Sequence, residues 1–214
     1  METEENAWLV PDLKDGAVFE TKVVIKRSIF ITTVGRVRGL EGAKKFVADI
    51  SAKYSDARHN PFAFNGGPAG NSGFAGCSDD GEPHGTAGQP MLQVVLHSGI
   101  GEVAAVVTRY FGGIKLGTGG LVRAYQGCVS DTMKELPVKK FIEMKAFRVR
   151  LSMAYIGALK RLMGQTGAET LEENYGAEAD FLVNVPIKEE KRFAASVVSL
   201  SSGSAIVSEV PALQ

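Results

Sequence analysis

The sequence of 214 residues predicts a two-domain α+β protein. A glycine-rich stretch between Gly66 and Gly120 holds fifteen of the 25 glycines, and ordinary composition returns after the Leu-Pro pair at 136–137. The elements expected beyond that point follow the order βαββαβ, which is the order of a ferredoxin-like sandwich. We therefore expect one domain over residues 1–140, with glycine-rich loops, and a ferredoxin-like domain over 141–214.

The first domain is expected to begin with a β-hairpin after a short polar lead. Residues 18–38 carry two runs rich in β-branched residues, and a turn is expected near Lys26 to Ser28. Apolar residues then recur at helical spacing from Glu41 to Tyr54. The further elements expected in this domain are a short strand at 60–64, a helix with Pro90 in its first turn, a buried strand at 103–111, a helix at 121–136 and a closing strand or connection at 141–144.

The second domain carries fewer chemical signals. Its expected elements are a strand at 146–152, a helix at 155–165, a strand pair around a turn at 174–176, a helix at 188–200 and a last strand at 205–210. It has no glycine-rich loop and no cluster of His and Cys residues. We therefore assign it a structural or partner-binding role.

The overall composition excludes several classes of protein. Lys plus Arg equals Asp plus Glu at 24 each, so RNA or another polyanion would have to be bound by a local patch. Cys77 and Cys128 are too few for a disulfide framework and are not clustered as in a zinc site, so no cofactor is expected. The chain begins with an acidic segment and has no long apolar run, which indicates a cytoplasmic protein without a membrane partner.

The loop from 112 to 120, with the sequence GGIKLGTGG, joins an expected strand to an expected helix. Backbone N–H groups and the positive end of the helix dipole attract anions such as phosphate at this position. Lys115 could neutralise ligand charge, and Thr118 could cap the helix or contact the ligand. The alternative is a tight turn that needs positive φ angles. The glycines of this candidate site are Gly112, Gly113, Gly117, Gly119 and Gly120.

A second polar loop, SDDGEPHGTAG at 78–88, contains three carboxylates. Asp79, Asp80 and Glu82 could hold magnesium beside a phosphate, or one of the aspartates could form an Asx turn before Gly81. The spacing does not complete an EF-hand, and we expect no metal. The histidine of this loop, His84, is either a general base or a surface residue.

Two arginines flank the glycine loop. Arg109 and Arg123 could each contact an anion with two hydrogen bonds, or pair with a carboxylate of the 78–88 loop. The second arrangement would tie the two loops together. We therefore expect the loops to face each other across one groove, with the carboxylates mainly positioning the loop and its basic neighbours, and we include Thr86 among the candidate binding residues.

Two segments carry a resemblance to a known family. SDDGEPHGTAGQPML at 78–92 and VVTRYFGGIKLGTGGLVRAY at 106–125 closely resemble the signature of the IMPACT family. The resemblance implies an N-terminal ribosomal-protein-like α/β sandwich, of the second-domain type, followed by a ferredoxin-like domain. It also implies a link to the regulation of translation.

Two hypotheses about function follow. The first is a binding protein that contacts RNA, the ribosome or a translation factor through the two loops, with an anion or phosphate held at the glycines. The second is a magnesium-dependent enzyme that acts on a phosphorylated small molecule or an RNA end. We favour an organised recognition loop over a catalytic centre.

Overall fold

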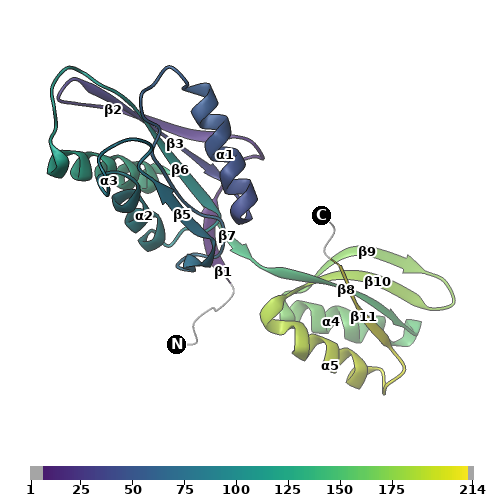
Figure 1. Cartoon of the computed structure of the whole chain (residues 1–214). Coiled ribbons are helices and arrows are strands. Elements are labelled where there is room, and N and C mark those ends of the chain that lie inside the picture. The colour runs from purple at the N-terminus through teal and green to yellow at the C-terminus, as the bar shows by residue number, and fades with distance from the viewer. Residues whose placement is uncertain (1–6, 212–214) are drawn as a thin grey trace. The chain divides into compact units, whose positions relative to one another are not determined.

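The structure, a computed structural model, describes residues 7–211. Within this range the chain forms two compact units, one over Trp8–Phe141 and the other from Ile142 onward. Both units combine helices with antiparallel sheets, as Figure 1 shows, and this confirms the predicted α+β class. Each unit has its own buried hydrophobic core.

The N-terminal unit is built on a five-stranded antiparallel sheet with the strand order β2-β3-β6-β4-β5. Its central strand β6 is buried along almost its whole length, as its apolar sequence predicts. The elements of the unit are β1 (Ala7–Pro11), β2 (Val18–Ile25), β3 (Ser28–Arg36), α1 (Gly39–Lys53), β4 (Phe62–Asn65), a short 3₁₀ turn (Ser72–Phe74), β5 (Ala75–Ser78), α2 (Gly88–His97), β6 (Val103–Tyr110), α3 (Thr118–Glu135) and β7 (Val138–Ile142).

Helices cover both faces of this sheet. Side chains alternate between the faces of β6, so Val103, Ala105 and Val107 pack with α2 and α3, whereas Ala104 packs with α1. The same alternation puts Arg109, two residues beyond Val107, on the α2 and α3 face. A charged side chain thus continues the row that fills the core.

Two strands of this unit were missed. The lead before the hairpin, expected to be only polar, contains β1, which pairs with β7 in a separate two-stranded sheet. β5 was also missed because its sequence, AGCS, has little β propensity and forms a strand only against β4. The closing strand expected at 141–144 lies a few residues earlier, at Val138–Ile142.

The predicted hairpin is confirmed, and its turn packs against the glycine loop. Lys26 and Arg27 both have positive φ angles, of 47° and 68°, which is the backbone of a two-residue type I′ turn. A Cβ atom added at Gly112 would lie 2.0 Å from the carbonyl carbon of Arg27, so only glycine fits there. The amide of Gly112 also donates to Ser28 Oγ at 3.2 Å.

The C-terminal unit has the predicted βαββαβ order. Its antiparallel sheet has the strand order β11-β8-β10-β9, and α4 and α5 both pack on β10 in one core with Phe181 and Phe193. This is the arrangement of the ferredoxin-like sandwich. The elements are β8 (Met144–Leu151), α4 (Ile156–Thr166), β9 (Glu169–Tyr175), β10 (Ala179–Pro186), α5 (Glu190–Leu200) and β11 (Ile206–Val210), with short 3₁₀ turns before the two helices (Met153–Tyr155 and Ile187–Glu189).

We expect Gly112→Ala to destabilise the N-terminal unit by about 1–3 kcal/mol, because the added methyl group overlaps the hairpin backbone. Gly119→Ala is the matched control, since a Cβ atom there would have no neighbour within 4 Å. Trp8 is the only tryptophan of the chain and lies in this unit, so its fluorescence during denaturation reports on the unit. Equal stability of the two variants would contradict the close packing at Gly112.

Candidate functional site

Asp79 organises the loop at 78–88 and neutralises the start of α2. Its carboxylate accepts hydrogen bonds from the amides of Gly85, Ala87 and Gly88 at 2.7, 3.0 and 2.8 Å. Burial alone raises the pKa of Asp79, but the three N–H donors and nearby His84 outweigh it and hold the pKa below its usual value. The carboxylate therefore occupies the place at this helix end where an anion would bind.

Asp80 fixes the neighbouring strand. Its Oδ2 accepts the amide hydrogen of Asn60 at 2.6 Å, and its carbonyl oxygen accepts from His59 Nδ1 at 2.8 Å. Asp80 and Gly81 have φ angles of 45° and 80°, so the backbone turns sharply between this carboxylate and Glu82. The Asx-turn alternative does not form at either aspartate, because the side chain of Asp80 accepts from Asn60 and that of Asp79 accepts from the amides of residues 85, 87 and 88.

Glu82 and Arg109 form a buried ion pair between the loop and β6. Glu82 Oε1 lies 2.6 Å from Arg109 Nη1 and also accepts from the hydroxyl of Tyr125 on α3 at 2.7 Å. The side chains of Glu82 and Arg109 are 3% and 9% exposed. Burial first, and then the charge of Glu82, raises the pKa of Tyr125 well above its usual value. One carboxylate thus joins the loop, the sheet and α3.

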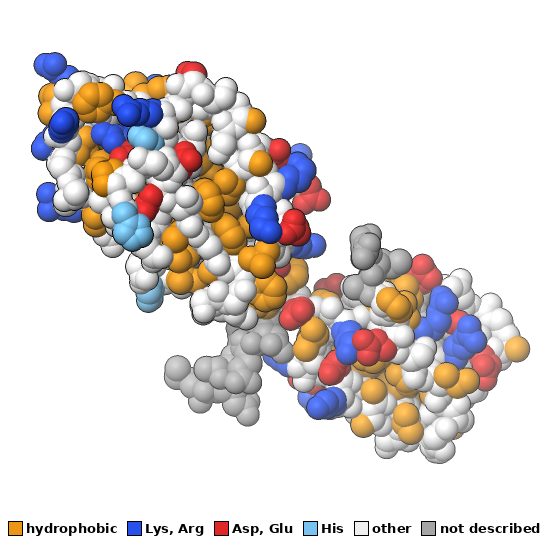
Figure 2. Space-filling view, in the orientation of Figure 1, with side chains coloured by type: hydrophobic (Ala, Val, Ile, Leu, Met, Phe, Trp, Pro, Cys, Tyr) orange, Lys and Arg blue, Asp and Glu red, His pale blue; other side chains and the backbone are white. Residues whose placement is uncertain are grey.

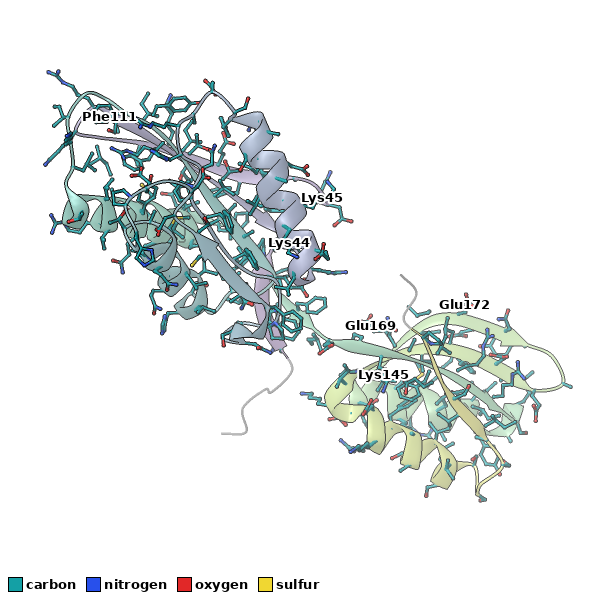
Figure 3. All side chains as sticks on the ribbon, viewed as in Figure 1. Lys44, Lys45, Phe111, Lys145, Glu169 and Glu172 are labelled. Atoms are coloured by element: carbon teal, nitrogen blue, oxygen red, sulfur yellow. The ribbon has the colours of Figure 1, made fainter. Side chains whose placement is uncertain are left out.

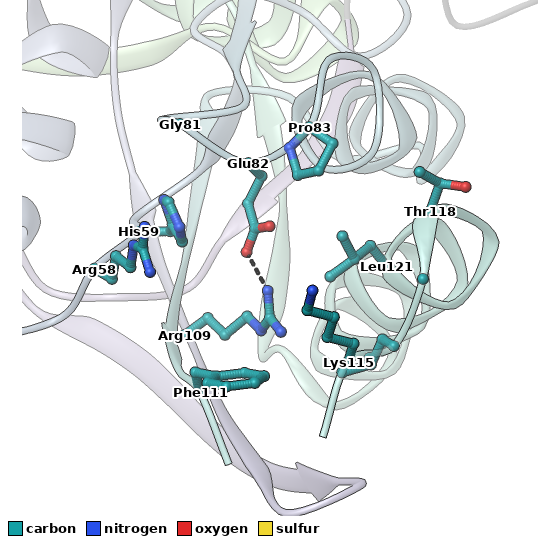
Figure 4. A pocket seen from close by; sticks show the side chains of 12 residues that line it. Arg58, His59, Gly81, Glu82, Pro83, Arg109, Phe111, Lys115, Thr118 and Leu121 are labelled. Carbon is teal, nitrogen blue, oxygen red and sulfur yellow. Dashed lines mark hydrogen bonds and ion pairs between the residues drawn. The ribbon is translucent and has the colours of Figure 1, made fainter. Parts of the chain in front are cut away.

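The ion pair forms one wall of a cavity of about 440 Å³ between the two predicted loops. Figure 4 shows Arg109 extending from β6 between Glu82 and Lys115. The lining residues are Arg58, His59, Gly81, Glu82, Pro83, Arg109, Phe111, Lys115, Leu116, Gly117, Thr118 and Leu121. The expected groove between the loops and the expected carboxylate–arginine pair are both confirmed.

Several predicted site residues lie outside this cavity. Arg123 lines a different hollow, beside Thr21 of β2, because residues 121 and 125 turn the other side of α3 toward the core. Thr86 is buried and its hydroxyl donates to the carbonyl of Pro83, so it holds the loop. Among the predicted carboxylates and glycines, those that do not line the cavity are Asp79, Asp80, Gly112, Gly113, Gly119 and Gly120.

The glycine loop contributes its second half to the cavity. Thr118 is the first residue of α3 and lines the cavity, while the residue before it, Gly117, provides no side-chain cap. Of the two alternatives for Thr118, helix capping does not occur, and ligand contact stays a prediction. Lys115 is exposed and makes no ion pair with any residue in 7–211.

The predicted candidates did not include seven of the lining residues, which are Arg58, His59, Gly81, Pro83, Phe111, Leu116 and Leu121. Arg58 and His59 come from the segment before β4, and Phe111 follows β6 directly and is 55% exposed. Figure 3 shows Phe111 at the end of the N-terminal unit. His59 reaches the cavity because it forms an antiparallel bridge with Arg109. The two residues are fifty positions apart, so no local sequence pattern indicates this pairing.

His59 is held in one orientation. Its Nδ1 atom carries the ring hydrogen, because the carbonyl oxygen of Asp80 can only accept. In the neutral ring, the other nitrogen, Nε2, is then an acceptor, and His59 lines the cavity. His84, in contrast, has a fully exposed side chain whose Nδ1 lies 3.7 Å from Asp79 Oδ2. Of the two alternatives for His84, the structure shows the surface residue.

The described residues 7–211 contain no group of three His, Cys, Asp or Glu side chains placed to hold a metal ion. The two cysteines are unpaired, and burial followed by the charge of Asp131 raises the pKa of Cys128 to about 12. No helix in the same range is long and apolar enough to cross a membrane.

Comparison with known proteins shows which family this chain belongs to. The model of the Impact N-terminal domain matches residues 26–133, which include both loops and every residue lining the cavity. The chain belongs to the IMPACT family. A second model, a domain of unknown function, matches residues 154–204 of the C-terminal unit of this family member.

Relatives of this IMPACT protein align along almost the whole chain. "IMPACT family member YigZ" of Escherichia coli is 38% identical over 92% of this chain and 95% of its own length. "IMPACT family member YvyE" of Bacillus subtilis is 34% identical over 89% of this chain and 87% of its own length. A crystal structure of a hypothetical protein, 36% identical, aligns with a TM-score of 0.67 over 97% of this chain and 99% of that one.

We expect Asp79→Asn to destabilise the N-terminal unit by about 1–2 kcal/mol at pH 7. Because the folded-state pKa of Asp79 is lowered, its stabilisation is complete above the unfolded-state pKa and is lost as the pH falls through the folded value. The difference from the unmodified protein should therefore shrink under acidic conditions. Exposed Asp49→Asn is the control, and a difference that stays constant with pH would contradict this assignment.

We expect Glu82→Gln to destabilise the same unit by about 3 kcal/mol, since it leaves the buried charge of Arg109 without a counter-ion. Glu41→Gln, which removes an exposed ion pair with Lys44, should change stability by less than about 1 kcal/mol. Denaturation followed by Trp8 fluorescence measures both. Similar losses for the two variants would show that the Glu82–Arg109 pair does not hold the loop.

Proposed function

We propose that this IMPACT family member is a cytoplasmic binding protein linked to translation, and that it contacts RNA through the cavity between the two loops. The observation that carries the proposal is a concentration of unpaired positive charge at the cavity, in a protein whose formal net charge is zero. Arg58 and Lys115 line the cavity and make no ion pair with residues in the described range. A local patch of this kind supplies the attraction that the overall charge balance does not.

The surroundings of the cavity support the same reading. Lys26 and Arg27 form the hairpin turn that packs on the glycine loop, so they extend the positive surface beside it. In Figure 2, Lys and Arg side chains gather over the end of the N-terminal unit where this turn and the start of α3 lie. Phe111 offers an exposed ring in the same region, and nucleic-acid bases stack on such rings.

The contacts of the carboxylates favour binding over magnesium-dependent catalysis. The carboxylate of Asp79 accepts hydrogen bonds from three backbone amides, and that of Asp80 accepts from the amide of Asn60. The carboxylate of Glu82 accepts from Arg109 and Tyr125. These contacts lie on three different segments, so the three carboxylates do not gather around a common point. A binding role needs only cations without acidic partners, such as Arg58 and Lys115 at the cavity.

Titration of a labelled single-stranded RNA, followed by fluorescence anisotropy at several salt concentrations, tests this proposal. We expect affinity to fall with salt, and Lys115→Ala and Arg58→Ala each to weaken binding about three- to tenfold and to reduce the salt slope by about 0.7. Arg123→Ala is the matched control, because Arg123 lies on α3 outside the cavity. RNA binding that persists unchanged in both cavity variants would overturn the proposal, as would binding to a purified translation factor instead of RNA.

A further inference from the structure

The two helices that follow the glycine-rich loops begin in opposite electrostatic states. The start of α2 is neutralised by Asp79, whose carboxylate accepts from the amides of Ala87 and Gly88. The start of α3 has no side-chain cap and no acidic residue in its first turn, and Gly117 and Thr118 line the cavity. An 18-residue helix thus presents an uncompensated positive end to a hollow, a place suited to an anion.

Arg109 is a second, independent observation that favours anion binding at this place. The residue is 8% exposed, and its Nε donor is buried without a hydrogen-bond partner among residues 7–211. Only its Nη1 atom reaches Glu82, through one hydrogen bond, so the pair is not the two-bond fork that arginine and a carboxylate often form. Buried donors are seldom left unpaired, and this guanidinium lines the cavity beside Lys115.

The charge inside the cavity indicates which anion fits. Its lining contains three fixed cations, Arg58, Arg109 and Lys115, against the single carboxylate of Glu82. An excess of two positive charges suits a phosphate monoester, which carries about −1.5 to −2 at neutral pH, better than a phosphodiester with one negative charge. The site therefore favours a terminal phosphate over one inside a nucleic-acid strand.

The rest of the cavity is shaped for more than a phosphate. Phe111, Leu116 and Leu121 form an apolar wall, and the volume of about 440 Å³ lies within the range of small-ligand sites. Phe111 is 55% exposed, and the guanidinium carbon of Arg109 lies 5.7 Å from its ring centre. His59 adds an oriented acceptor, Nε2, for a hydroxyl or N–H group.

We propose that the cavity binds a nucleoside 5′-monophosphate unit, with the phosphate at Arg109, Lys115 and the start of α3, and the base against Phe111. This chemistry occurs in a free mononucleotide and at the 5′-phosphorylated end of an RNA strand. The second source rests on the proposed function, since it requires RNA binding at the same cavity. The first does not.

The experiment compares three ligands on the full chain. An RNA decamer with a 5′-phosphate should bind at least about tenfold more tightly than the same decamer with a 5′-hydroxyl. Lys115→Ala should abolish that preference, whereas Arg123→Ala should keep it. Uridine 5′-monophosphate, measured by calorimetry, should bind more tightly than inorganic phosphate, and Phe111→Ala should remove this second difference without weakening phosphate binding.

The possible results separate this inference from the proposed function. If both decamers bind equally and depend on Lys115, RNA binding stands and the terminal-phosphate inference falls. If uridine 5′-monophosphate binds and neither decamer does, the nucleotide site stands and RNA binding falls. If inorganic phosphate binds as tightly as the nucleotide, or if none of the ligands binds, the inference is overturned.

Discussion

The arrangement of the candidate site depends on one buried ion pair, that of Glu82 with Arg109. It joins three segments that are distant in sequence, because Glu82 belongs to the loop before α2, Arg109 to β6, and Tyr125, which donates to the same carboxylate oxygen, to α3. Removing two charges from water has a large energetic cost, so each partner stabilises the protein only while the other stays in place. The pair therefore fixes the position of the loop, and with it one wall of the cavity.

Three carboxylates within four residues have three different tasks because the backbone reverses direction among them. The positive φ angles of Asp80 and Gly81 turn the chain between the residue that caps α2 and the residue that meets Arg109. A similar cluster in a regular strand or helix would project its side chains at fixed intervals. The composition of such a loop thus indicates that charges are needed there, but only the turn geometry decides whether they converge on an ion or separate to hold the loop.

Sequence reasoning succeeded where the information was local and failed where it depended on pairing across the fold. The hairpin at 18–38, the helices and the βαββαβ order follow from periodicity and turn residues, and the loop-to-arginine contact follows from the charges near 79 and 109. The role of His59 depends on its bridge to Arg109, and β1 depends on its pairing with β7 and on its bridge to Ile100. Arg123 lies outside the cavity because Leu121 and Tyr125 face the core, and helical spacing then puts Arg123 on another side of α3.

The distribution of ion pairs explains how a chain with no net charge can attract an anion at one place. In the C-terminal unit, four cations have acidic partners: Arg148 and Arg150 share Asp180, Lys145 contacts Glu190 and Glu209, and Lys160 contacts Glu173. At the cavity, Arg58 and Lys115 lack such partners among residues 7–211, and the one acidic side chain is already used by Arg109 and Tyr125. Fields from paired charges cancel over short distances, whereas unpaired charges beside a low-dielectric wall act further into the solvent. Under the proposed function, the cavity is therefore where a neutral chain would attract an anion.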